Sequence, residues 1–419
     1  MRNDYSVVVG LDWADEEHAV CWKDGTSGKV HSGTVKHRPE LIEAWILQLS
    51  QEHPDGRIAV VLEQKTGKVV YALMQYCNVD LYPVNPVTVS NYRKAFSPSG
   101  AKDDPSDAKL MLEIFERHPE ELRILKPDTE ETRKLEGCCK DRRRLVDLRS
   151  SLGNTLKQTL KEYFPQALEL LPKEIYSRIA CAFLMKWPDF GSLSRAQAQT
   201  IRKFYYRHNS RSNRLIEERL ELIASGRPAC TDQAVLETSL MRVKSLLRQI
   251  VELNRSIGEY DNVIAAIFKN HEDREIFESL PGAGEKLAPR ILTAFGSDRD
   301  RYGSASEAAT FMGVAPVIES SGKHLWIHWR WHCPTFLRQS LMEFSWKSTQ
   351  YSKWAKIYYD SQIEKGKSHA AAARALAFKW VKIIYRCWQN REVYDEGKYL
   401  ASLKKHGSWI ADELEKKAA

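Results

Sequence analysis

The sequence lacks the cysteine patterns that mark a zinc site or a disulfide framework. Its eight cysteines include no C-x-x-C pair. The adjacent Cys138 and Cys139 suit neither a zinc site nor an easily formed disulfide. We therefore expect free thiols, as in a protein of a reducing cytosol.

Long apolar runs, internal repeats and low-complexity segments are absent too. No run reaches the roughly 18 apolar residues that a membrane span needs. The apolar stretch near the N-terminus, in MRNDYSVVVGLD, is too short for a signal peptide. These absences argue against a membrane protein and favour a soluble intracellular one.

What the chain does have is the composition of a globular protein with a basic balance. Its 419 residues are enough for two or three domains, and 43% hydrophobic and 28% charged residues are typical of folded chains. The 63 Lys and Arg residues against 55 Asp and Glu give a formal net charge of +8. This balance suggests a polyanionic partner, with nucleic acid as a candidate.

The amino-terminal part of the chain predicts an α/β fold. Continuous or alternating apolar residues predict strands, and apolar residues at helical spacing predict helices. The predicted strands span residues 5–12, 17–23, 28–37, 57–64 and 79–85. The predicted helices span residues 39–53, 69–76 and 105–118.

Helical patterns dominate after residue 128. One long helix is predicted over residues 129–164 and a second over residues 232–270. In the second, apolar residues and one asparagine recur at alternating steps of four and three: Leu236, Leu240, Val243, Leu247, Ile250, Asn254 and Ile257. This spacing predicts a coiled coil or a long antiparallel pair, and the alternative is a long helix packed within its own domain.

Acidic residues stand at the ends of several predicted elements. Asp12 and Glu63 each end a strand, and Asp104 and Asp107 lie three apart at the start of a helix, on one face. Polar residues at strand ends are where sites form in α/β sheets. Four converging carboxylates repel one another without a cation, and two Mg²⁺ ions would neutralise them and polarise a phosphodiester.

The same acids also have a structural interpretation. Asp104 before Pro105 suits an N-cap, Asp107 favours the helix dipole, and a strand-terminal aspartate can begin a turn. Capping does not account for Asp12 together with Glu63, and it does not exclude metal binding. The neighbouring Asp103 is not expected to be a ligand.

The carboxy-terminal part is rich in tryptophan, histidine, lysine and arginine. Residues 280–296 predict the turn of a helix–hairpin–helix element or a plain interhelical turn. Farther on, Ser320 and Ser321 precede Gly322 in a predicted polar loop. Such a serine is usually part of a turn, but the cationic residues near it in sequence suit a hydroxyl that attacks a phosphate.

Basic and aromatic residues supply candidate nucleic-acid contacts. The candidate phosphate contacts are Lys140, Arg142, Arg143, Arg144, Lys323 and Arg330. The alternative for the cluster at 140–144 is a solvated helix face. Trp326, Trp329 and Trp331 either stack on bases or pack in a core.

The order of the acids resembles the ribonuclease-H-like fold, and within it the RuvC-like branch of the Holliday-junction resolvases. The residues that carry this resemblance are Asp12 in GLDWA, Glu63 in VLEQKTG, and Asp104 and Asp107 in AKDDPSDAK. Nearly the whole chain resembles the DEDD transposases of bacterial insertion sequences, the recombinases described as bridge-RNA-guided. The further motifs are LPGAGEKLAPRILTAFG, FMGVAPVIESSGK, FLRQSLMEF and AKIYYDSQIEKGKSHAAAARALAFKWVKIIYRCW.

The resemblance implies a composite active site. A RuvC-like domain would supply four acids that bind two Mg²⁺ ions. These acids correspond to Asp12, Glu63, Asp104 and Asp107 of this sequence. A carboxy-terminal transposase domain would supply a serine nucleophile, which carries over onto Ser321, with Ser320 as the alternative. Attack on a DNA phosphate would give a transient phosphoserine link, followed by strand exchange and resealing without net hydrolysis.

The resemblance also implies partners and a location. The partners are donor and target DNA, a structured noncoding bridge RNA, and further copies of the chain in a dimer or tetramer with coiled-coil contacts. The expected location is the bacterial cytoplasm, at the nucleoid. The chain departs from the family's usual pattern at DDPSD, where a Lys-Thr-Asp lead is commoner, and in the Trp- and His-rich segment HLWIHWRWHCPTF.

We expect an α/β domain followed by mainly helical regions. The expected domains are a RuvC-like DEDD domain at 1–127, a helical or coiled-coil region at 128–276, a transposase domain with the serine at 277–391 and a solvated tail at 392–419. Two other functions stay open: a RuvC-like junction endonuclease that acts by metal-assisted hydrolysis, and a non-catalytic DNA-binding scaffold. The four acids disfavour the scaffold, and the serine separates the two enzymes.

Overall fold

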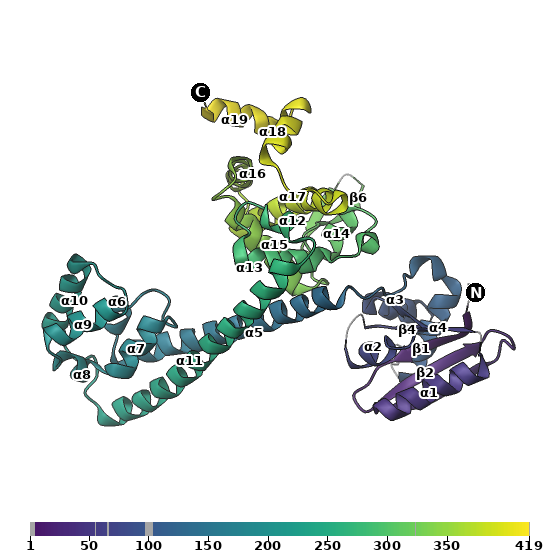
Figure 1. Cartoon of the computed structure of the whole chain (residues 1–419), viewed down its shortest axis with the longest axis horizontal. Coiled ribbons are helices and arrows are strands. Elements are labelled where there is room, and N and C mark those ends of the chain that lie inside the picture. Colours follow the sequence, from purple (N-terminus) through teal and green to yellow (C-terminus); the bar gives the residue numbers. More distant parts are fainter. Residues whose placement is uncertain (1–4, 55, 65–66, 97–103, 323, 419) are drawn as a thin grey trace. The chain divides into compact units, whose positions relative to one another are not determined.

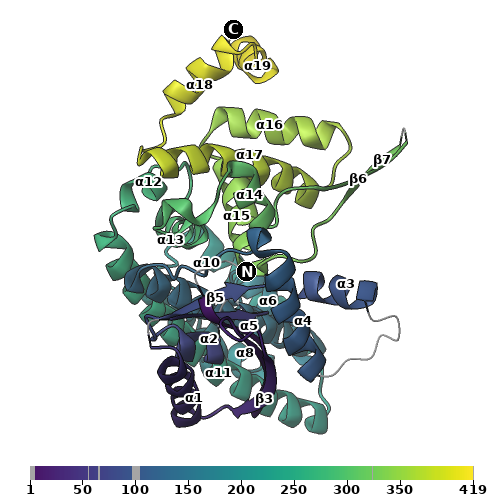
Figure 2. The same cartoon turned by 90° about the vertical axis from the view of Figure 1, so that its right-hand side faces the viewer.

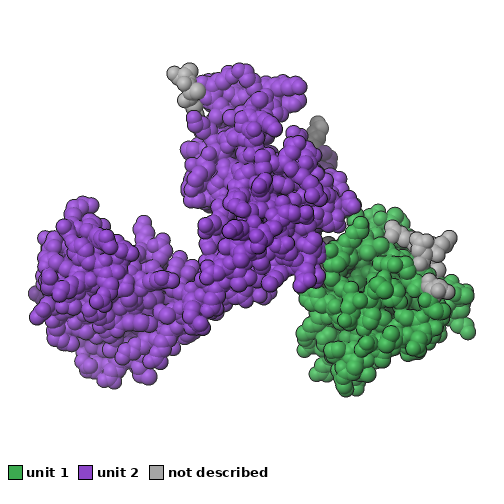
Figure 3. All heavy atoms as spheres, viewed as in Figure 1, with its two compact units in different colours: residues 1–127 green, residues 128–419 purple. Residues whose placement is uncertain are grey.

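A computed structural model describes residues 5–54, 56–64, 67–96, 104–322 and 324–418. The chain divides into two compact units, Met1–Pro127 and Asp128–Ala419, which are coloured separately in Figure 3. All eight cysteines lie in the described part and are free thiols. Among the helices of that part, none combines the length and the apolar character that crossing a bilayer requires.

The amino-terminal unit is built on a mixed β-sheet. In its described residues the strands are ordered β3-β2-β1-β4-β5. Strands β1, β4 and β5 run parallel, whereas β2 is antiparallel to both β1 and β3. The bounds are β1 (Tyr5–Asp12), β2 (Glu17–Asp24), β3 (Val30–Lys36), β4 (Arg57–Leu62) and β5 (Val79–Pro83). The α/β class predicted for this part of the chain is confirmed.

Helices cover both faces of this sheet (Figures 1 and 2). Alternation along β1 sends Val7, Val9 and Leu11 into one core and Val8 into the other. The first core is closed by α1 (Pro39–Glu52) and α2 (Lys68–Leu73), and the second by α3 (Pro86–Phe96) and α4 (Asp104–Arg117). A short 3-10 turn, Pro119–Glu121, follows α4.

Helix α4 runs antiparallel to β1. Tyr5, at the start of β1, contacts Phe115 near the end of α4, with ring centroids 6.0 Å apart. Gly10, near the end of β1, lies against Ala108, so that a Cβ at Gly10 would come within 2.0 Å of the Ala108 carbonyl oxygen. The first turn of α4 therefore lies beside the last residues of β1.

Replacing Gly10 with alanine is expected to destabilise the amino-terminal unit. The obstructing atoms belong to the backbone of α4, so the helix must shift as a whole, and we expect a loss of about 1–3 kcal/mol in the free energy of unfolding. Hydrogen exchange of the β1 and α4 amides measures this loss. Gly33→Ala on β3 is the control, because its Cβ would meet only the Trp22 ring, at 3.5 Å. Equal protection in the two variants would contradict the packing.

A buried histidine makes the same unit sensitive to acid. His18, at the start of β2, is 1% exposed. Its Nδ1 accepts a hydrogen bond from the Ala14 N–H at 3.3 Å, and its Nε2 lies 2.9 Å from His37 Nδ1. Burial, and then the nearby His37, lower the pKa of His18 from 6.5 to about 4.

We expect the unit to lose stability as the pH falls from 6.5 towards 4. In this window the unfolded chain binds the proton that the folded chain excludes, so the contribution is complete above the unfolded pKa and amounts to at most about 3 kcal/mol. Hydrogen exchange of the β1 and β2 amides, corrected for intrinsic rates, measures it. His18→Gln should flatten the pH dependence of the unit's stability, whereas His31→Gln on the exposed β3 should leave that dependence unchanged. A unit that gains stability on acidification would refute this assignment.

Two long helices form the middle of the carboxy-terminal unit, α5 (Glu130–Tyr163) and α11 (Gln233–Asn270). Polar pairs between them give their direction. In order along α5, the pairs are Arg142–Asp261, Arg149–Asn254 and Glu162–Arg242. Because the numbers rise on one helix as they fall on the other, the helices are antiparallel.

The predicted seam of α11 faces inward within this single chain. Its buried members are Val243, Leu247, Ile250 and Ile257. Asn254 donates to the Tyr176 carbonyl oxygen at 2.7 Å and accepts from Arg149 at 2.9 Å. The seam residues therefore serve a long antiparallel pair, one of the two forms that the spacing predicted.

The residues between the long helices form a separate helical core with the end of α5 and the start of α11 (Figure 1). This distal core contains, for example, Leu160 of α5 and Leu247 of α11. Its helices are α6 (Ala167–Leu170), α7 (Arg178–Lys186), α8 (Phe190–Ser194), α9 (Ala198–Arg207) and α10 (Asn213–Ser225).

The rest of the unit surrounds a carboxy-terminal core in which Trp354, Trp380 and Trp388 are fully buried. Its helices are α12 (Arg274–Glu278), α13 (Gly284–Phe295), α14 (Ala305–Phe311), α15 (Thr335–Ser348), α16 (Lys353–Glu364) and α17 (His369–Asn390), with a 3-10 turn at Arg299–Arg301. A two-stranded hairpin, β6 (Val317–Ser321) and β7 (His324–His328), projects from the helices (Figure 2). The mainly helical class predicted for this region is confirmed.

The segment after residue 391 differs from the expected solvated tail. It forms α18 (Glu396–Lys405) and α19 (Trp409–Ala418), and both Tyr394 and Ile410 are buried in the carboxy-terminal core. The segment has many lysines and glutamates, which suggested a solvated tail. It also has an apolar stripe, since Ile410 and Leu414 lie one helical turn apart and pack against the core.

Candidate active site

Two of the predicted acids lie side by side at one edge of the sheet. Leu11 of β1 pairs with Leu62 of β4 in parallel register, so the next residues, Asp12 and Glu63, are neighbours on adjacent strands, which lie roughly 5 Å apart. Asp12 continues the side-chain alternation of Val8, and Glu63 that of Val61. Both acids therefore point to the face that α4 covers, and both are half-buried.

The other two acids lie in the first turn of α4, beside the same edge. Asp104 is the first residue of the helix, and its side chain lies outside the described residues, as does Asp103. Asp107 is buried and forms an ion pair with Arg93 of α3, whose Nε donates to its Oδ1 at 2.8 Å. The fold thus brings Asp12, Glu63 and the start of α4 to one place.

The donor chemistry at this edge fits a hard divalent cation, because carboxylate oxygens are the ligands that Mg²⁺ prefers. The described residues contain no group of three or more His, Cys, Asp or Glu side chains arranged to hold a metal ion. Arg93 engages Asp107. Metal binding by Asp107 would need its second oxygen or displacement of that guanidinium.

The two candidate serines lie in β6, at the tip of the exposed hairpin. Ser321 pairs with His324 in antiparallel register, which leaves a two-residue turn that begins at Gly322. Gly322 has φ of +58°, the left-handed conformation that such hairpin turns use. The predicted polar loop is therefore a strand and a tight turn, and both serines are exposed.

Ser320 and Ser321 face opposite sides of the hairpin, because successive side chains of a strand alternate. Ser320 shares its side with Ile318 and Ile327, which are 61% and 63% exposed. The side of Ser321 carries polar and aromatic groups. On it, His324 stacks on Trp326 with ring centroids 5.7 Å apart, and His328 Nε2 lies 2.9 Å from Glu319 Oε2.

The predicted phosphate contacts on α5 are all ion-paired with carboxylates. The pairs are Lys140–Glu136, Arg142–Asp261, Arg143–Asp147, Arg143–Glu343 and Arg144–Asp141. A phosphate would have to compete with these partners, so contact by this cluster stays a prediction. Lys323 lies outside the described residues. Arg330 follows β7 and is half-buried.

Sequence reasoning missed three arginines beside the candidate sites. Arg93 neutralises Asp107, while Arg338 and Arg374 lie over the ring of Trp329 at 4.7 and 4.2 Å from its centroid. No local pattern marks Arg93 or Arg338. An arginine at an apolar helical position, such as Arg374 among the alanines of HAAAARALAF, is the signal that was available.

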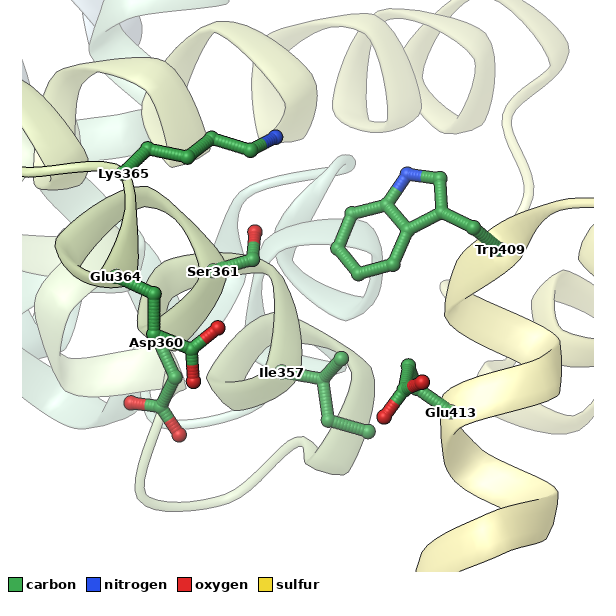
Figure 4. A pocket seen from close by; sticks show the side chains of 7 residues that line it. All are labelled: Ile357, Asp360, Ser361, Glu364, Lys365, Trp409 and Glu413. Carbon is green, nitrogen blue, oxygen red and sulfur yellow. The ribbon is translucent and has the colours of Figure 1, made fainter.

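A cavity of about 410 Å³ lies between α16 and α19 (Figure 4). It is lined by Ile357, Asp360, Ser361, Glu364, Lys365, Trp409 and Glu413. None of the predicted site residues that the structure describes is among them, and we assign it no function.

Two family models match the chain, and both describe transposases. Residues 9–165 match a DEDD-type model for IS110, described as a transposase, and residues 274–360 match the model of the transposase IS116/IS110/IS902 family. Together they cover more than half of the chain. The first match contains Asp12, Glu63 and the start of α4, and the second contains Ser320 and Ser321. The chain belongs to the IS110/IS116 family of insertion-sequence transposases, and its α/β domain is consistent with the RuvC-like DEDD class.

Individual relatives resemble the chain along much of its length. A protein described as the candidate transposase of the IS117 mini-circle of Streptomyces coelicolor is 26% identical over 414 residues, 96% of this chain and 98% of that one. The IS1111A transposase of Coxiella burnetii is 23% identical over 75% of this chain and 70% of its own length. A protein of insertion element IS900 of Mycobacterium paratuberculosis is 30% identical over 36% of this chain and 38% of its own length.

Proposed function

We propose that this transposase is an RNA-guided DNA recombinase that cuts and rejoins strands through a transient phosphoserine, with Ser321 as the nucleophile and Mg²⁺ at the acidic edge. The observation that carries the proposal is the placement of Asp12 and Glu63 side by side, next to the first turn of α4. Membership of the transposase family supports DNA cleavage and strand transfer as the reaction class.

The serine step needs no net hydrolysis. The Ser321 Oγ attacks a DNA phosphorus, a P–O(Ser) bond forms, and one strand end leaves as a hydroxyl. A strand-end hydroxyl then attacks the phosphoserine, which restores a phosphodiester and frees the serine. Ser321 is preferred to Ser320 because its side of the hairpin carries His324, an imidazole directly across the strand pair that can accept the serine proton.

The metal would be held by Asp12, Glu63, Asp104 and Asp107. When bound, Mg²⁺ supplies Lewis-acid stabilisation of charge on a phosphodiester. The chain's own contribution is to hold the carboxylates in place through β1, β4 and α4. Arg93 would hold the Asp107 side chain in position when no cation is bound.

The acids and the serine belong to different units, and we propose that they meet in one composite site within a dimer or tetramer at the nucleoid. Copies of the chain would contact one another through exposed faces of α5 and α11 in a coiled coil. A structured noncoding RNA from the insertion sequence would pair with donor and target DNA and so select both. The α/β domain at 1–127, the helical region at 128–276 and the serine domain at 277–391 would divide these tasks.

Strand exchange with and without RNA tests guidance. Purified chain would be mixed with labelled donor and target duplexes, Mg²⁺, and RNA transcribed from the noncoding DNA that flanks the gene. We expect recombinant product only with the RNA, and a changed target when the pairing segment of the RNA is changed. Product formed equally well without RNA would refute guidance. Hydrolysed ends with no covalent protein–DNA complex would favour the junction endonuclease instead.

A further inference from the structure

Arginines from three segments gather around Trp329 at the base of the β6–β7 hairpin. The guanidinium carbon of Arg374, on α17, lies 4.2 Å from the centroid of the Trp329 ring, and that of Arg338, on α15, lies 4.7 Å from it. Arg338 Nη1 also donates to the backbone carbonyl oxygen of Arg330 at 2.7 Å. The charges of Arg338 and Arg330 also reach the thiol of Cys333. Burial raises the pKa of this thiol, and the two charges offset part of that rise.

None of the three arginines has an ion pair with a carboxylate among the described residues; Arg338 and Arg374 instead contact the Trp329 ring, and Arg338 a backbone carbonyl. Arginines elsewhere in the same core are paired, as Arg290 is with Glu343 and Arg299 with Asp273. In the cluster, Arg330 Nε and Arg374 Nη1 are inaccessible to solvent and have no hydrogen-bond partner in the described part of the chain, as is also true of Arg290 Nη2 and Arg299 Nε. The cluster therefore has donors and charge to spare.

An arrangement of this kind destabilises the free protein and is relieved by an anion. Burial, and then Arg338, lower the pKa of Arg374. Like charges held together and buried donors without acceptors both raise the free energy of the unliganded state. An anion with several oxygens would satisfy the donors and compensate the charge at once. Stacking on the indole fixes the planes of the Arg338 and Arg374 guanidinium groups, which are themselves half-buried.

We propose that Arg330, Arg338 and Arg374 form a binding site for a backbone phosphate of DNA. This inference deepens the proposed function and rests on its DNA substrate; the binding site does not depend on the serine or the metal, and only its distance from the reacting phosphate uses Ser321. A phosphodiester fits because its two free oxygens match the guanidinium fork, and because DNA is what transposases act on.

The position of the cluster separates this phosphate from the one that reacts. Arg330 lies beyond the end of β7, and Ser321 pairs with His324 at the opposite end of the strand. Strand β7 spans about 13 Å from His324 to His328, which corresponds to roughly four nucleotides along one strand of a duplex at about 3.4 Å each. The arginines are therefore positioning residues that fix the register of the DNA on the hairpin.

DNA binding across a range of salt concentrations tests the site. The probe is a fluorescein-labelled 40-bp duplex, and the protein is the full chain carrying Ser321→Ala, without Mg²⁺, so that no strand is cut. We expect Arg338→Gln and Arg374→Gln each to weaken binding about fivefold at physiological salt and to reduce the slope of log affinity against log salt by about one. Arg202→Gln is the matched control, because Arg202 is ion-paired with Glu217 in the distal core.

Further variants and a second probe make the outcome decisive. Arg374→Lys keeps the charge and loses the planar fork, so we expect an intermediate affinity, and this variant decides the matter if the glutamine variant melts early. Unchanged affinity and slope in both glutamine variants, or an equal loss in Arg202→Gln, would overturn the proposal. So would a loss seen only with a 40-bp RNA duplex. Failure of the serine chemistry would leave this binding result standing, since the assay uses none of it.

Discussion

Replacing Ser321 with alanine is expected to abolish the covalent protein–DNA complex and to slow strand exchange by at least about 10⁴-fold, as removal of a nucleophile does in other covalent mechanisms. The reason is chemical. Without the Oγ no phosphoserine forms, and the energy of the phosphodiester cannot be stored for resealing. Denaturing gels of end-labelled DNA measure the complex, and product formation measures the exchange rate.

Ser320→Ala is the matched control, one residue away on the opposite side of the hairpin. Because Ser320 lies with Ile318 and Ile327 rather than with the histidines, its loss should change the rate by no more than a few-fold. Normal exchange in Ser321→Ala would refute the assignment. Loss of the covalent complex in Ser320→Ala alone would move the nucleophile to that residue.

Asp12→Asn and Glu63→Gln should each reduce strand exchange about a thousandfold, because a metal ligand supports several kcal/mol of transition-state stabilisation. Both changes keep the shape of the side chain and remove a charge, so the sheet should stay folded. The covalent complex with labelled DNA should be lost along with the exchange.

Metal binding itself gives a second readout for these variants. Mg²⁺ or Mn²⁺ should raise the melting temperature of the unmodified chain and leave that of Asp12→Asn unchanged. Asp15→Asn is the control, since Asp15 is exposed and ion-paired with Lys68 near the same turn. A cation-dependent shift that survives in Asp12→Asn, or normal activity in that variant, would show that the acids do not hold the metal.

The sheet and its acidic edge could be predicted from sequence because each strand is a local apolar pattern. Strand β1 ends at Asp12 as predicted, and both long helices lie within a residue or two of their predicted bounds. Helix α3 was missed, since its first residues, PVTVS, are β-branched or turn-forming and have low helix propensity. Its position comes from packing Val89 against the sheet, and this long-range contact has no local signature.

The hairpin shows where a local pattern was available and was misread. Residues 317–321 and 324–328 begin or centre on β-branched and aromatic residues and flank a glycine, which is a hairpin signal, yet the short polar run around Gly322 suggested a loop. The difference matters, because a loop would not separate the two serines and a strand puts them on opposite sides.

The ion pairs on α5 were beyond sequence reasoning for a different reason. Arg142 finds Asp261 on α11, and Arg143 finds Glu343 on α15, partners more than a hundred residues away. From sequence alone, a run of basic residues predicts a positive surface, but acidic side chains from other helices can pair with those residues and compensate their charge. The arginines around Trp329 are the converse case, since only the fold reveals that they lack such partners.

The antiparallel pair of α5 and α11 sets the distance between the carboxy-terminal core and the distal core. Both connections to the distal core run through rigid helices, with no flexible linker, and each residue sets about 1.5 Å of reach. Removing seven residues from each helix at matching positions would bring the distal core about 10 Å nearer while keeping its rotation nearly unchanged. Removing two or five would rotate it by about 140–160° and so turn it to a different side. The number of helical residues therefore sets both the distance of the distal core and its rotation. Changes in steps of seven residues alter the distance and leave the rotation nearly unchanged.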